Sequence, residues 1–242
     1  MNKFIVPMLA VSACATAAHA IPVLTFDPAM HGEIITNQYA GSHGITVSAN
    51  NLNRSFDLAV AFNSLLTGTA DPDLEGPPWS GGNLAPDTVL GNMLILQENN
   101  TGIGDGIADN PDDEAGRPAG DLIFDFATAQ TQFGFDLIDV EGTMEENGMV
   151  SFFLGGGLVG APIALSDITN IASPFFDPTV TFGDNTANSL GPWDAADFGA
   201  INFDRVVIRL GGSGAVDNIA VPTPGAGAIL GGLALAGLRR KR

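Results

Sequence analysis

Acidic side chains are the residues of this chain whose spacing could do chemistry. Within Thr69–Pro77, Asp71, Asp73 and Glu75 occupy alternate positions. In an extended segment, alternate side chains project to one side, so these three carboxylates could share one cation. The run therefore predicts a calcium site, and the alternative is a set of solvated turn acids.

A second acidic run lies in Gly104–Glu114 and contains Asp112 and Asp113. Its spacing partly matches calcium repeats built on Asp-Gly-x-x-Asp. Thr101 and Ile103 stand where such repeats would carry further ligands. Because all the candidate ligands are oxygens, calcium is favoured over zinc.

The sequence offers few residues for catalysis. The only cysteine is Cys14, and the only histidines after the N-terminal segment are His31 and His43, each beside a glycine. Gly211–Ala215 falls one residue short of the Gly-x-Ser-x-Gly nucleophile elbow. We expect no catalytic residue and a protein that is not an enzyme. A polysaccharide-active enzyme that uses a carboxylate pair stays open, because the required separation is three-dimensional.

Two tryptophans are candidates for glycan contacts. Trp79 and Trp193 each follow a proline in a loop-like segment, where an exposed ring could stack on a sugar. The alternative is that each ring caps the edge of the core.

Glycine and proline interrupt short apolar runs throughout the chain, which favours strands joined by turns. We therefore expect an all-β fold: a single jelly-roll-like β-sandwich of antiparallel strands. The expected strands are Val23–Phe26, Ile45–Ala49, Asp57–Phe62, Asn92–Gln97, Asp121–Phe126, Gln132–Ile138, Met149–Leu154, Val180–Phe182, Ile201–Leu210 and Gly214–Val221.

The phenylalanine-rich strands show the clearest alternation. Phe124 and Phe126 share one strand face, as do Phe133 and Phe135 on the next strand. The short connection at Ala127–Thr131 predicts an antiparallel hairpin. The same alternation within Ile201–Leu210 predicts a sheet with one buried face and one wet face. Thr67–Asp87 and Glu98–Gly120 are expected to be long loops, either functional or disordered.

Both ends of the chain have the pattern of targeting segments. Lys3, an apolar stretch and the triplet Ala18–Ala20 form a secretory signal peptide over residues 1–20, which we expect to be a cleavable helix. The apolar run from Pro224 to Leu238 is too short for a durable membrane helix. We expect it to be an apolar sorting helix that attaches to the membrane only transiently, through the tail.

The C-terminal tail resembles the PEP-CTERM class of bacterial sorting tails. The matching residues are Val221, Pro222, Thr223, Pro224, Arg239, Arg240, Lys241 and Arg242, with threonine where the usual motif carries glutamate. The resemblance implies processing by an exosortase-type enzyme. Together with the N-terminal pattern, it divides the chain into three expected segments: a signal peptide over 1–20, a β-sandwich body over 21–220 and a sorting tail over 221–242.

The exported body is strongly acidic. All 27 acidic residues lie in it, against four arginines, which gives a net charge near −23. Such a field repels phosphate backbones, so nucleic acid is excluded as a partner, while divalent cations and neutral glycans are compatible with it. Solubility outside the cell is the alternative explanation of the charge.

A set of short segments, together with the phenylalanine-rich strands, is similar to the jelly-roll bodies of exported PEP-CTERM proteins: Thr25–Asp27, Ile35–Gly41, Gly44–Ser48, Asp71–Leu74, Gly91–Glu98 and Gly212–Ile219. In architecture the body also resembles carbohydrate-binding modules in which acids of the first and last strands hold a structural calcium. That resemblance implies Asp27, Glu33 and Asp217 as metal ligands.

Taken together, the sequence predicts an exported protein of the cell envelope or extracellular matrix that is stabilised by calcium and has a structural or adhesive role. The first alternative is a carbohydrate-binding module that acts on extracellular polysaccharide (exopolysaccharide).

Overall fold

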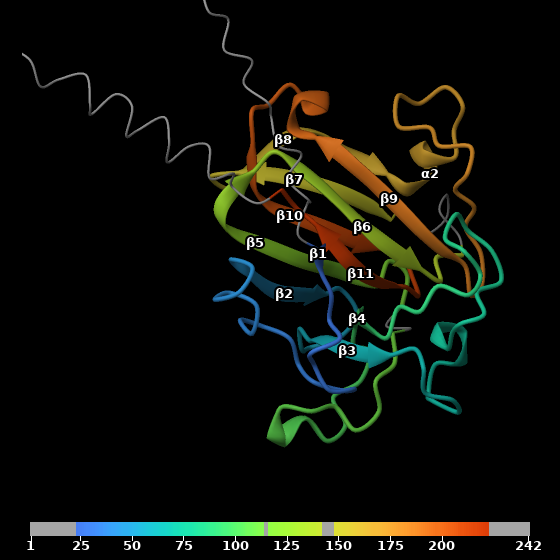
Figure 1. Cartoon of the computed structure of the whole chain (residues 1–242). Helices are drawn as coiled ribbons and strands as arrows, with labels where there is room; N and C mark the ends of the chain where they lie inside the picture. The colour runs from blue at the N-terminus through green and yellow to red at the C-terminus, as the bar shows by residue number, and fades with distance from the viewer. Residues whose placement is uncertain (1–22, 114–115, 142–147, 223–242) are drawn as a thin grey trace, which may run out of the picture.

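The computed structural model describes residues 23–113, 116–141 and 148–222 (Figure 1). Val221 and Pro222 belong to this part, and Val221 is buried in the core. The expected signal peptide lies outside it, and so do the sorting-tail residues Thr223, Pro224, Arg239, Arg240, Lys241 and Arg242. Both targeting segments therefore stay predictions. Within the described ranges, no helix has the length and apolar character needed to cross a membrane.

The fold is a sandwich of two antiparallel sheets, which confirms the all-β expectation (Figure 1). The first sheet has the order β3 (Ala59–Asn63), β4 (Asn92–Leu96), β11 (Ala215–Ala220), β6 (Gln132–Ile138) and β9 (Ala187–Asp194), and β1 (Val23–Leu24) also pairs with β11. The second sheet has the order β2 (Ile45–Asn51), β5 (Gly120–Gln130), β10 (Phe203–Leu210), β7 (Met149–Leu154) and β8 (Gly157–Ala164). Short helical turns lie between strands: η1 (Pro72–Leu74), η2 (Ile103–Asp105), α2 (Leu165–Ile168) and η3 (Ala195–Phe198).

The predicted phenylalanine hairpin is wrong. β5 pairs with β2 and β10, whereas β6 pairs with β11 and β9 in the other sheet. The chain changes sheets at Thr131, between the two strands. Phe124 and Phe126 of β5 therefore face Phe133 of β6 across the interior, with ring centroids 6.3 Å apart in both pairs. Alternation predicts one apolar face on each strand, and two such faces can be buried against each other from opposite sheets.

Two edge strands were not predicted. β8 is mostly exposed, and β9 carries Gly191 and Pro192 within it. Because an edge strand pairs on one side only, it tolerates residues that would break a central strand. Conversely, the predicted strand Val180–Phe182 is wrong, because this segment is part of the connection that leads into β9.

The expected solvent-exposed face is present on β10 of the second sheet. There, Arg205 and Arg209 pair with Asp125 and Asp121 along the outer face.

The first sheet does not have an exposed face of this kind. Every residue of its strand β4 is buried. A second apolar cluster covers its outer face, built from strand residues and from the long loops; it includes Val60, Phe62, Leu74, Trp79, Leu90, Met93 and Ile95. The long loops are thus part of the packed structure.

Candidate metal centres

Three carboxylates from the long loops meet beside the β10–β11 turn. Asp71, Asp112 and Asp113 each offer an oxygen, and these oxygens all lie within 4.8 Å of one another. Asp71 directly precedes η1, and the other two precede β5 by a few residues. Among the described residues, this set is the convergent group of three or more potential metal ligands. We call it the loop cluster.

The local backbone explains which acids reach the loop cluster. Residues 72–74 form the 3₁₀ turn η1, so the segment is not extended as the alternating pattern assumed. Asp71 caps this turn by accepting from the Asp73 N–H at 3.2 Å. Glu75 instead accepts from the N–H and hydroxyl of Thr69, at 2.8 and 3.0 Å. These bonds lower the Glu75 pKa and hold its carboxylate within its own loop.

A serine hydroxyl ties the loop cluster to the β10–β11 turn. The Ser213 hydroxyl lies 3.1 and 3.2 Å from the two oxygens of Asp113 and 2.5 Å from Asp139 Oδ2. The Gly214 N–H also donates to Asp113, at 2.5 Å. A hydroxyl has one proton to donate. It can donate that proton to only one of the two carboxylates at a time, so Asp113 and Asp139 compete for it.

The pKa values agree with this conflict. Burial raises the pKa of Asp139 to about 7. Burial also raises the pKa of Asp113 well above its usual value, and the negative charges of Asp71 and Asp139 add to that rise. For Asp112, burial and the nearby Glu98 raise the pKa to about 6. Carboxylates crowded in this way favour either protons or a shared cation.

Beside the loop cluster lies a small pocket of about 130 Å³, lined by Asp71, Asp73, Asp112, Asp139 and Ser213 among others. The named side chains offer oxygen ligands of the kind that calcium prefers, from four segments of the chain. A cation held there would connect the start of η1, the segment before β5, the segment after β6 and the β10–β11 turn. Asp73 lines this pocket without belonging to the group of three.

A second group of acids lies where the first and last strands meet. Asp217 of β11 is 1 % exposed, and neither of its carboxylate oxygens has a hydrogen-bond partner among the described residues. Burial, followed by the charges of Asp136 and Asp27, raises its pKa to about 8, although the nearby backbone of Asn218 and Phe26 opposes part of the shift. Asn92 Oδ1 is a further buried acceptor without a donor. We call the acids Asp217, Asp136 and Asp27 the strand-end cluster.

Asp27, Glu33 and Asp217, the metal ligands implied by the resemblance, are neighbours, but their oxygens are not equally free to bind a metal. Burial raises the pKa of Tyr39 to about 12, and the negative charges of these three acids add to that rise. Asp27 Oδ1 accepts from the Asn92 N–H at 3.1 Å. Glu33 is already bonded to the Met30 N–H at 2.9 Å and to the Gln38 amide at 3.2 Å.

Sequence reasoning named Asp71, Asp112, Asp113 and Asp217 but missed their partners. Ser213 stood out only as part of an incomplete nucleophile elbow, and Asp139 carried no spacing signal. Asp139 and Ser213 reach the loop cluster from turns next to β6 and β11, remote in sequence from Asp71.

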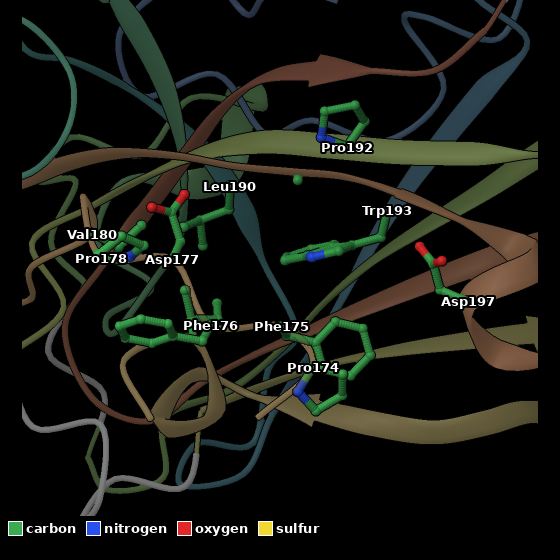
Figure 2. A pocket seen from close by; sticks show the side chains of 12 residues that line it. Pro174, Phe175, Phe176, Asp177, Pro178, Val180, Leu190, Pro192, Trp193 and Asp197 are labelled. Atoms are coloured by element: carbon green, nitrogen blue, oxygen red, sulfur yellow. The ribbon is translucent and has the colours of Figure 1, made fainter. Parts of the chain in front are cut away.

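The two tryptophans occupy different environments. Trp79 is 3 % exposed inside the second apolar cluster, and its indole N–H donates to the Thr88 carbonyl at 2.8 Å. Its ring therefore caps the core. Trp193 is also largely buried, at 8 % exposed, but it lines a surface pocket of about 480 Å³ (Figure 2).

No family model matches the chain, and no curated protein matches it. Among solved structures, the chain is similar to the crystal structure of the K2 cleaved adhesin domain of Lys-gingipain. The TM-score is 0.37 and the sequence identity is 14 %, over 84 % of this chain and 100 % of that one. No functional conclusion follows from a likeness at this level.

Proposed function

We propose that the chain is an exported, jelly-roll-like β-sandwich that binds structural calcium and serves a non-catalytic, structural or adhesive role in the cell envelope or extracellular matrix. One observation carries the proposal. Asp71, Asp112 and Asp113 converge from separate loops, and Asp113 shares a single serine hydroxyl with Asp139. A divalent cation would relieve that repulsion and join the loops.

Export supports calcium as the ion. The N-terminal pattern of a signal peptide and the PEP-CTERM-like tail both direct the body out of the cytoplasm. An exosortase-type enzyme would then remove the tail, which ends the transient attachment to the membrane. Outside the cell, the body would meet divalent cations at concentrations that oxygen-only sites of moderate affinity can use.

The burial of the acids supports a structural role. Asp113 is 1 % exposed and Asp139 is 2 % exposed. A carboxylate so enclosed cannot touch a polysaccharide, whereas it can hold an ion that fixes the loops. The long loops between β3 and β4 and between β4 and β5 form much of the cover of the first sheet.

Calorimetric titration of the chelator-treated, exported protein with calcium tests the proposal. We expect saturable binding that weakens in Asp112→Asn and is unchanged in Asp87→Asn. Asp87 is a matched control because it is an exposed loop acid outside the cluster. Absence of calcium binding to the wild-type protein would refute the proposal.

A further inference from the structure

A surface pocket separate from the loop cluster is lined by none of its three acids. It has a volume of about 480 Å³ and lies between β9 and the segment that follows α2. Figure 2 shows the Trp193 indole reaching into it from β9, with Leu190 nearby and Phe175 and Phe176 on the facing segment. A pocket of this size is large enough for a small organic ligand.

Trp193 is fixed by the core and keeps an open donor. Its ring packs against Phe135 and Phe152, with centroids 6.2 and 6.5 Å away. In the described part of the chain, its indole N–H has no acceptor, although the side chain is only 8 % exposed. The nitrogen is not among the fully enclosed unpartnered atoms, so part of it stays accessible to solvent. Buried tryptophans usually find a partner for this N–H.

Two carboxylates supply acceptors to the same pocket. Asp177 and Asp197 appear on opposite sides of the indole in Figure 2. Asp177 Oδ1 accepts from the N–H and hydroxyl of Thr179, at 2.8 and 2.6 Å. Asp197 Oδ2 accepts from the Asp194 N–H at 3.0 Å. These bonds orient both side chains, and within the described residues the second oxygen of each accepts no further hydrogen bond.

The indole donor and the two carboxylate acceptors of this pocket favour one class of ligand. The lining residues include no lysine, arginine or histidine, and two of them are acids, so an anionic ligand is repelled. A lysine or arginine side chain offers donors only and leaves the indole N–H unpaired. A sugar hydroxyl both donates and accepts. One neutral sugar can therefore pair with the indole and the carboxylates while its C–H faces lie against phenylalanine, leucine and proline.

We infer that this pocket binds a neutral saccharide of one or two rings through Trp193, Asp177 and Asp197. The inference rests on the proposed function and deepens it, because it names the kind of surface that an adhesive body would hold.

Calorimetry on the calcium-saturated, exported protein tests this inference. The probes are neutral gluco-, manno- and galacto-oligosaccharides, an oligogalacturonate and a proline-rich peptide that contains arginine. We expect a neutral oligosaccharide to bind best. Trp193→Phe keeps the aromatic ring and removes the N–H, and should weaken binding about fivefold or more. Asp197→Asn should have a similar effect, because a hydrogen bond to a charged acceptor is stronger than one to an amide.

Trp79→Phe is the matched control, because Trp79 lies outside the pocket and should leave the affinity unchanged. Melting curves must show that each variant folds. The inference is overturned if no neutral oligosaccharide binds at millimolar concentrations, if Trp193→Phe and Asp197→Asn bind like wild type, or if the peptide or the oligogalacturonate binds best. Calcium binding without saccharide binding refutes this inference alone, whereas saccharide binding without calcium binding refutes the calcium proposal alone.

Discussion

Replacement of Asp112 by asparagine should change stability in opposite directions with and without calcium. In the metal-free protein, burial and the charge of Glu98 raise the pKa of Asp112. The folded state therefore disfavours the ionised carboxylate at neutral pH, and the neutral amide removes that cost. Metal-free Asp112→Asn should melt at a higher temperature than metal-free wild type.

Calcium should reverse this order. At a calcium concentration of 100 times Kd, binding adds about 2.7 kcal/mol of stability to the wild-type protein. For a body of this size, that corresponds to a rise in Tm of about 5 to 11 °C. Loss of one charged ligand costs about 2 kcal/mol of binding, or about 30-fold in Kd. The same calcium concentration then adds only about 0.9 kcal/mol, which raises Tm by about 2 to 4 °C.

Differential scanning calorimetry of both proteins, in chelator and in calcium, measures all four melting temperatures. Asp87→Asn, an exposed loop acid, serves as the control and should follow wild type in both conditions. The reasoning is refuted if Asp112→Asn gains as much from calcium as wild type does. It is also refuted if the metal-free variant melts below the metal-free wild type.

The structure makes three further predictions. Burial raises the pKa of Asp139 to about 7 and that of Asp217 to about 8. Their protonated forms therefore stabilise the folded protein near pH 4, and this contribution is lost as the pH rises through those values. The Tm of the metal-free protein should fall between pH 5 and pH 8, and a flat profile would contradict this. Gly91 has φ of +69° and a Cβ there would meet Asp27 Oδ1, so Gly91→Ala should lose more stability in urea than Gly68→Ala, which has φ of +72° and open space around it; equal losses would show that Asp27 does not constrain this turn. The intact mass of the protein recovered outside the producing cell should lack Arg242, and a mass that includes it would argue against tail processing.

The central strands of the second sheet, such as β5 and β10, were predictable because one face of each is buried. The alternation of Phe124 and Phe126, and of Val206, Ile208 and Leu210, marks the residues that the structure places in the interior. Alternation does not say which sheet a strand joins. The same phenylalanine pattern is compatible with a hairpin and with two strands that face each other, and only the second occurs.

The edge strands β8 and β9, and the loop cover over the first sheet, were beyond this kind of reasoning. β8 buries almost nothing, so its sequence carries little alternation. β3 and β4 are buried on both faces, which gives continuous apolar runs instead of a period of two. Their second cover comes from Leu74, Trp79 and Leu90, which lie in loops that composition alone marks as polar.

The acids of the site were found through composition, but their arrangement depends on contacts between distant segments. Asp71 and Asp112 belong to loops that glycine, proline and aspartate identify as irregular. Ser213 and Asp139 come from the turns beside two strands of the first sheet, and strand pairing brings them to the loops. Sequence spacing cannot reveal a site that is assembled by sheet register.

Both acidic clusters contain buried carboxylates at positions where the strand pattern does not require a polar residue. Interior positions of a sandwich are filled at least cost by apolar residues, yet Asp113 and Asp217 are both 1 % exposed. Asp217 keeps two oxygens without a donor, and Asp113 shares its serine with another acid. Acids with raised pKa values destabilise the metal-free protein at neutral pH. A divalent cation bound beside these carboxylates would remove part of that cost.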